Sequence, residues 1–162
     1  ASTVNGGIRM AGNVKSESLS TVNGTVTVGE SSSVDGDIGT VNGRVTLEKG
    51  ASVTKDVDNV NGRIELISAE IGGDLSTVGG DVNLSDGSVL NGDLIVEKPS
   101  NWNWKNQKSR KPRIVIGPGS RVGGTIKLER EAELYVSETA EIGGVSGVMS
   151  MDDAVRFSGD SP

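Results

Sequence analysis

Cysteine and histidine are both absent from the 162 residues, and aromatic residues are nearly absent, with one Phe, one Tyr and two Trp. Without cysteine the chain has neither disulfides nor thiolate metal sites, and its redox compartment stays open. Without histidine it lacks the usual general base near neutral pH and the commonest metal ligand. Any core must therefore be built from aliphatic side chains.

The sequence also lacks a long apolar run. Nothing in it approaches the roughly 18 consecutive apolar residues of a membrane-spanning helix, so we expect no transmembrane segment. No secretory leader is visible before the first repeat, although such leaders are removed from mature proteins. The net charge of −6 argues against nucleic acid as a partner.

Glycine, in contrast, is abundant, with 24 residues, and much of it belongs to a repeat. The tripeptide Val-Asn-Gly begins at Val4, Val22, Val41 and Val60, and a Val-Gly-Gly variant begins at Val78. Successive starts are 18, 19, 19 and 18 residues apart. A fixed period of this length is the signature of a solenoid in which each repeat is one coil.

Aliphatic residues keep constant offsets from the start of each repeat. Two rows are Ile8, Val26, Val45, Ile64, Val82 and Met10, Val28, Leu47, Leu66, Leu84, and further rows contain Val34, Ile38, Val53, Val57, Ile71, Leu75, Leu90 and Leu94. The pattern returns with Ile114, Ile116, Val122 and Ile126, and again with Leu134, Val136 and Ile142. Within a repeat these residues lie two apart and are mostly β-branched or Leu, which is typical of strands.

Short strands at this period predict an all-β fold, a single-stranded parallel β-helix with three short strands in each turn of 18–20 residues. About seven turns stacked at about 4.8 Å would make a rod about 34 Å long. We assign residues 1–147 to the β-helix, with an inserted loop at 97–113, and residues 148–162 to a C-terminal cap.

The stacked coils would place Asn5, Asn23, Asn42 and Asn61 above one another at one corner. There each amide can donate to one neighbouring coil and accept from the other, or satisfy free backbone groups of the corner. The glycine that follows each asparagine suits a corner with positive φ. We expect this asparagine ladder to be structural rather than ligand-binding.

A second polar column contains Asp37, Asp56, Asp74 and Asp93, and it ends at Thr125. Carboxylates about 5 Å apart raise one another's pKa or attract a cation, and calcium favours such oxygen ligands. Aspartate also hydrogen-bonds the backbone of its own turn. We expect the aspartate column to be structural and to hold no metal, with a cation site as the alternative.

The insertion at 97–113, EKPSNWNWKNQKSRKPR, is where the repeat is interrupted. It contains both tryptophans and six bases, which leaves ten bases against 21 acids elsewhere, a balance of −11. Its candidate ligand-binding residues are Trp102, Trp104, Lys105, Lys108, Arg110 and Lys111. Tryptophan beside lysine and arginine favours anionic lipid headgroups, acidic glycans or single-stranded nucleic acid. The alternative is a hairpin that folds back on the rod.

The two ends of the chain differ from the repeats between them. Residues 1–3 lead directly into the first coil without a capping segment, whereas Met149, Met151, Val155 and Phe157 leave the pattern and would cover the last coil. An uncapped coil presents unpaired backbone groups to another chain. Either a further N-terminal segment precedes this coil, or the coil docks on a partner. We expect self-association, as a dimer or a polymer, through the N-terminal coil.

The segment IVIGPGSRVGGTIKLEREAELYVSETAEIGG, residues 114–144, resembles the bactofilins, a polymer-forming cytoskeletal β-helix family, and a weaker match covers roughly residues 4–144. The serial Val-Asn-Gly turns are similar to those of exported bacterial β-helix proteins of unknown function. The tryptophan-bearing insertion and the asparagine ladder depart from the bactofilin pattern, and the membrane-targeting tail of some bactofilins is not visible.

This resemblance implies a right-handed, three-sided coil in a bacterial structural protein that assembles end to end. It implies the periplasm or cell envelope as the location, with a lipid anchor on a removed leader as one form, and the cytoplasmic cytoskeleton as the alternative. The β-helical acyltransferases with which the chain could be compared use histidine, and β-helical glycosidases and lyases have longer turns. We expect a non-enzymatic envelope scaffold without a cofactor. The alternative is a binding module that uses the 97–113 loop on an anionic lipid or glycan.

Overall fold

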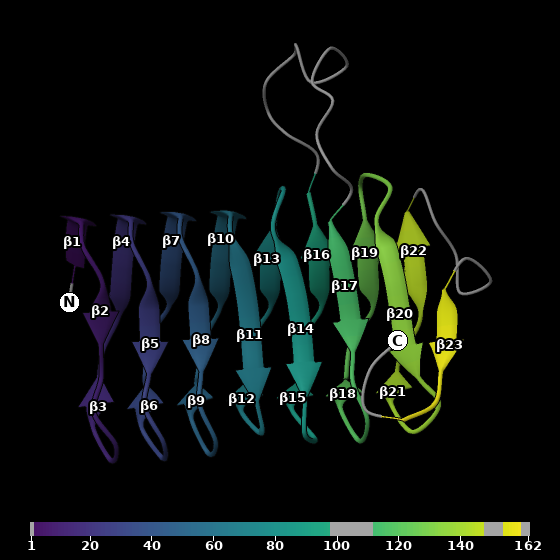
Figure 1. The fold of residues 1–162 in the computed structure, drawn as a ribbon, viewed down its shortest axis with the longest axis horizontal. Coiled ribbons are helices and arrows are strands. Elements are labelled where there is room, and N and C mark those ends of the chain that lie inside the picture. The colour runs from purple at the N-terminus through teal and green to yellow at the C-terminus, as the bar shows by residue number, and fades with distance from the viewer. Residues whose placement is uncertain (1, 98–111, 148–153, 160–162) are drawn as a thin grey trace, which may run out of the picture.

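The chain winds through three parallel sheets in turn, and one passage through all three is one coil (Figure 1). The computed structural model describes residues 2–97, 112–147 and 154–159, which contain 23 strands and no helix. The smallest sheet has seven strands, one for each complete coil. The predicted parallel β-helix is confirmed.

The strands of each sheet come from successive coils. Sheet A contains β1 (Ser2–Asn5), β4 (Leu19–Asn23), β7 (Ile38–Asn42), β10 (Val57–Asn61), β13 (Leu75–Thr77), β16 (Leu94–Val96), β19 (Ile126–Leu128) and β22 (Val145–Gly147). Sheet B contains β2 (Ile8–Arg9), β5 (Val26–Val28), β8 (Val45–Leu47), β11 (Arg63–Ile67), β14 (Asp81–Ser85), β17 (Arg113–Ile116), β20 (Glu133–Ser137) and β23 (Val155–Phe157). Sheet C contains β3 (Lys15–Ser16), β6 (Ser33–Val34), β9 (Ser52–Val53), β12 (Glu70–Ile71), β15 (Val89–Leu90), β18 (Arg121–Val122) and β21 (Glu141–Ile142).

Figure 1 shows the direction in which the coil winds. The strands of sheet A run upward behind those of sheet B, which run downward in front, while the chain advances from left to right. The coil is therefore right-handed, the hand that parallel strand connections nearly always take.

Successive coils pair in register, so residues one period apart become neighbours. Ile64 of β11 lies opposite Val45 of the preceding coil and Val82 of the following one. All three are at most 1% exposed. The inward side chains of each coil pack on those of the next. The aliphatic rows predicted from the sequence therefore form one continuous interior.

The 97–113 insertion joins β16 of sheet A to β17 of sheet B. On its near side the Glu97 N–H donates to the Thr77 carbonyl at 2.8 Å, and on its far side the Glu133 N–H donates to the Pro112 carbonyl at 2.8 Å. The repeat resumes in register, with Ile114 opposite Val82. In the segment assigned to the C-terminal cap, β23 pairs with β20 as a further strand of sheet B, and Phe157 is 8% exposed.

Candidate functional site

The polar groups that the sequence singled out lie at the corners of the coil. Asn23 and its counterparts occupy the corner between sheets A and B, and Asp37 and its counterparts occupy the corner between sheets C and A. The third corner, between sheets B and C, repeatedly uses a residue in the left-handed region, such as Ser31 at φ 55° and Ser68 at φ 49°. Each corner therefore stacks residues from equivalent positions of successive coils.

The asparagine ladder forms as predicted. The Asn23 Nδ2 donates to Asn5 Oδ1 at 2.9 Å, Asn42 donates to Asn23 at 3.2 Å, and Asn61 donates to Asn42 at 3.3 Å. All four side chains are exposed, and the two inner ones make two ladder bonds each. Their hydrogen-bonding groups are used between coils, which explains the repeated asparagine by stacking alone.

Gly6 and Gly62 have positive φ, as predicted for the glycines that follow the asparagines, but Gly24 and Gly43 are needed for a different reason. Gly24 and Gly43 do not have left-handed φ values, so the expectation of positive φ is wrong for them. A Cβ on Gly43 would lie 2.7 Å from the carbonyl carbon of Gly24 in the preceding coil and closer still to its oxygen. The corner backbones of successive coils approach so closely that no side chain fits between them.

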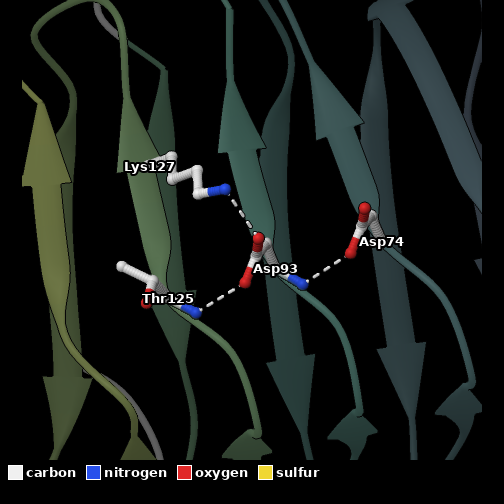
Figure 2. Close-up of polar contacts among 4 residues, drawn as sticks. All are labelled: Asp74, Asp93, Thr125 and Lys127. Atoms are coloured by element: carbon white, nitrogen blue, oxygen red, sulfur yellow. Dashed lines mark hydrogen bonds and ion pairs between the residues drawn. The ribbon is translucent and has the colours of Figure 1, made fainter.

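The aspartate column links each coil to the next through the backbone. The Asp37, Asp56 and Asp74 Oδ1 atoms accept the N–H groups of Asp56, Asp74 and Asp93, at 3.0, 2.8 and 2.8 Å. The last carboxylate, Asp93, accepts the Thr125 N–H at 2.8 Å (Figure 2). Each carboxylate therefore satisfies a backbone donor one coil further along, rather than the donor of its own turn.

This arrangement also explains why glycine so often precedes the aspartate. A Cβ on Gly73, Gly92 or Gly124 would overlap the Oδ1 atom of the aspartate in the preceding coil. Glycine leaves room for the carboxylate that bonds the following N–H. Among the described residues no group of three or more acidic side chains is placed to hold a metal ion.

The far end of the aspartate column carries its only described ion pair. The Lys127 Nζ lies 2.8 Å from Asp93 Oδ2, as Figure 2 shows. The hydrogen bond from Lys127, and after it the one from the Thr125 N–H, lowers the pKa of Asp93 below its ordinary value. The same pair raises the pKa of Lys127. Both groups are therefore held in their charged forms at neutral pH.

The asparagine ladder stops where the fifth coil has Val-Gly-Gly instead of Val-Asn-Gly. Asn61 Oδ1 faces Gly79, whose Cβ, if it had one, would lie 3.0 Å away. The corner there opens into a notch of about 280 Å³ lined by Arg44, Gly62, Arg63, Gly79, Gly80 and Asp81. This notch was not foreseen from the sequence.

A row of exposed valines is the second feature that the sequence reasoning missed. Val22, Val41 and Val60, the first residues of Val-Asn-Gly, are 37–39% exposed, and Val4 is 62% exposed. Val22, Val41 and Val60 border an open groove of about 470 Å³ on sheet A. This exposure could have been predicted from the two-residue period of a strand. Leu19 and Thr21 point inward, so Val22 points outward.

The inward position beside these valines is polar. Thr21, Thr40, Asn59 and Thr77 are at most 5% exposed and stack in one row. Thr21 Oγ1 donates to the Gly6 carbonyl at 3.1 Å, so this row also supports the glycine corner.

The candidate ligand-binding residues Trp102, Trp104, Lys105, Lys108, Arg110 and Lys111 lie outside the described residues. Of the insertion's bases, Arg113 is described. Its guanidinium carbon lies 5.0 Å from the centre of the Tyr135 ring, and its backbone N–H donates to Asp81 Oδ1 at 3.0 Å. Arg113 therefore packs against the neighbouring coil of the rod.

Comparison with known proteins found no family model, no curated protein and no solved structure that matches this chain. In the described part of the chain, no helix is long and apolar enough to span a bilayer. The class that the geometry defines is a right-handed parallel β-helix with hydrogen-bonded polar columns at its corners.

Proposed function

We propose that this chain is a non-enzymatic structural protein of the bacterial cell envelope, a bactofilin-like rod that lengthens by end-to-end association of its coils. The open edge of the first coil carries the proposal. Strands β1, β2 and β3 each pair with the second coil on one side, and no strand within the described ranges pairs with them on the other.

The backbone of that edge has the arrangement found inside the stack. The Ile8 and Met10 N–H groups donate to the Thr25 and Thr27 carbonyls of the second coil at 2.8 Å each. Alternate residues of a parallel strand bond to opposite neighbours. Arg9 lies opposite Thr27, between two residues that bond the second coil, so its own N–H and C=O point away from the second coil. In the first coil no described strand pairs with those groups, and an edge of this kind is a template for pairing.

The side-chain rows favour the same mode of association. Asn5 already accepts a hydrogen bond from Asn23, and its own amide N–H₂ has no partner in the part of the chain that the structure describes. A copy docked on this edge would extend the three sheets, and the Asn5 amide N–H₂ is left to donate to it. Contacts between unlike surfaces that do not close into a ring produce filaments.

The non-enzymatic part of the proposal is supported by how the polar residues are used. The asparagines bond one another, and the aspartates accept backbone N–H groups of the next coil. These columns are fully explained by stacking. The resemblance of residues 114–144 to the bactofilins supports the bacterial structural role and the envelope location.

A proline at the open edge tests the proposal. Proline removes the Arg9 N–H, and an edge strand tolerates this change when that N–H faces solvent. The matched control is Arg9→Ala, which removes the same charge and side chain but keeps the N–H. Sedimentation velocity and negative-stain imaging would compare both variants with the unmodified chain over a range of concentrations.

We expect the unmodified chain and Arg9→Ala to form species longer than one rod and Arg9→Pro to remain a single rod with unchanged far-UV circular dichroism. An unmodified chain that stays monomeric at high concentration would refute the proposal. Equal association of the two variants would also refute it, since the edge N–H would then have no role.

A further inference from the structure

Five asparagines of the described chain are followed by glycine: Asn5, Asn23, Asn42, Asn61 and Asn91. In this dipeptide the glycine nitrogen can attack the asparagine side-chain carbonyl carbon, because glycine has no Cβ to obstruct the approach. A C–N bond forms, ammonia leaves, and the cyclic imide then adds water at either carbonyl. The product is aspartate or isoaspartate, and the sum is asparagine plus water giving the acid plus ammonia.

The reaction needs a glycine nitrogen that is free to lose its proton and to turn toward the side chain. In four of the five dipeptides the stack prevents this. The N–H groups of Gly6, Gly24, Gly43 and Gly92 donate to carbonyls of neighbouring coils at 3.0, 3.3, 3.1 and 3.1 Å. Local opening of the stack must precede attack at each of them.

The asparagine side chains also differ in how many hydrogen bonds hold them. Asn23 and Asn42 each make two ladder bonds, and Asn91 Nδ2 donates to Glu70 Oε1 at 2.9 Å. Asn5 has a single ladder bond, but the following Gly6 N–H is bonded to the Asn23 carbonyl.

Asn61–Gly62 differs in both respects. Within the described ranges the Gly62 N–H has no acceptor and Asn61 Oδ1 has no donor. The ladder ends at Asn61 because Gly79, which has no side chain, stands where the next asparagine would be. Gly62 also lines the notch of about 280 Å³, so water reaches this corner.

From these observations we propose that Asn61–Gly62 is a site of self-modification, at which the folded chain deamidates while its other four described Asn-Gly dipeptides persist. The product has one more negative charge and loses the N–H₂ group that donates to Asn42. When isoaspartate forms, the backbone gains an extra methylene at the fourth coil's corner between sheets A and B, beside the fifth coil.

The folded chain itself provides the controls. The protein is incubated at mildly alkaline pH, samples are digested with trypsin, and the gain of one mass unit is followed at each asparagine by mass spectrometry. Cleavage after Lys55 and Arg63 isolates Asn61 in the peptide 56–63, away from the other four sites. A parallel incubation in urea measures the five rates without the fold, and Asn61→Gln identifies the new acidic species on ion exchange.

We expect Asn61 to react at least about tenfold faster than Asn23 or Asn42 in the folded chain, because only the latter two require prior opening. In urea the five rates should become comparable. Equal rates at Asn61 and Asn42 in the folded chain would overturn the proposal. An equally large preference for Asn61 in urea would also overturn it, because the local sequence would then be the cause.

Discussion

A single methyl group at the Gly43 corner should destabilise the stack far more than the same methyl group at Gly39 in the same coil. The Cβ of Gly43→Ala would lie 2.7 Å from the Gly24 carbonyl carbon, whereas a Cβ at Gly39 has nothing within 4 Å. Neither position has a left-handed φ. The two variants therefore differ in the space available between coils and share the same chemical change.

The magnitude follows from the bonds that the added methyl group must disturb. Ordinary contact begins near 3.4 Å, so clearing the carbonyl carbon alone opens the corner by about 0.7 Å, and clearing the closer carbonyl oxygen opens it further. That movement stretches the Gly24 N–Asn42 O bond, already 3.3 Å long, and the Asn42–Asn23 ladder bond of 3.2 Å. Two bonds at about 1 kcal/mol each and about 1–3 kcal/mol of overpacking give about 3–5 kcal/mol.

Gly39→Ala should instead stabilise the chain by about 0.4–1 kcal/mol, because alanine restricts the unfolded chain without a clash. Urea unfolding followed by far-UV circular dichroism would give both free energies of unfolding. A difference between the two variants of less than about 1 kcal/mol would refute the close-approach explanation of the glycine corners.

Three further predictions concern the polar groups at the three corners. Asn42→Ala removes two ladder bonds and should lower the free energy of unfolding by about 1–2 kcal/mol, roughly twice the effect of Asn5→Ala, and equal urea midpoints would contradict this. Ser31→Gly should raise the melting temperature, since a left-handed φ of 55° disfavours L-residues, and a lower value would count against strain there. The lowered pKa of Asp93 means that its stabilising contribution is present above the ordinary carboxyl pKa and is lost as pH falls through the lowered folded value. Lys127→Met should therefore move the Asp93 pKa upward in a carboxyl NMR titration, and an unchanged value would exclude the ion pair as the cause.

The period and the aliphatic rows were sufficient to predict the fold because register in a solenoid follows from the repeat itself. The equal spacing of Val26, Val45 and Ile64 predicts that they are neighbours, and the structure pairs them. The two polar columns were predictable for the same reason. Residues at the same position of each repeat stack above one another, whatever their side chains are.

What could not be predicted depends on how closely the coils approach each other. The spacing does not reveal that the Asp56 carboxylate reaches the N–H of Asp74 in the next coil, or that this carboxylate fills the space beside Gly73. The notch beside Gly62 arises from a single change in the repeat, at Gly79, which looks conservative in the sequence. Only the positions of the corner atoms show that the Gly62 N–H beside this change has no partner within the described residues.

The central claim is that residues one period apart are neighbours in adjacent coils, and a cysteine pair tests it most directly, because the chain has no cysteine of its own. Thr27 lies opposite Thr46, which lies opposite Glu65. Adjacent strands place Cα atoms about 4.8 Å apart, within the range of a disulfide, and strands two coils apart lie at about twice that distance. Under mild oxidation Thr27→Cys/Thr46→Cys should cross-link within the monomer, and Thr27→Cys/Glu65→Cys should not. Efficient cross-linking of the second pair, or failure of the first in the folded chain, would contradict the stacked coil.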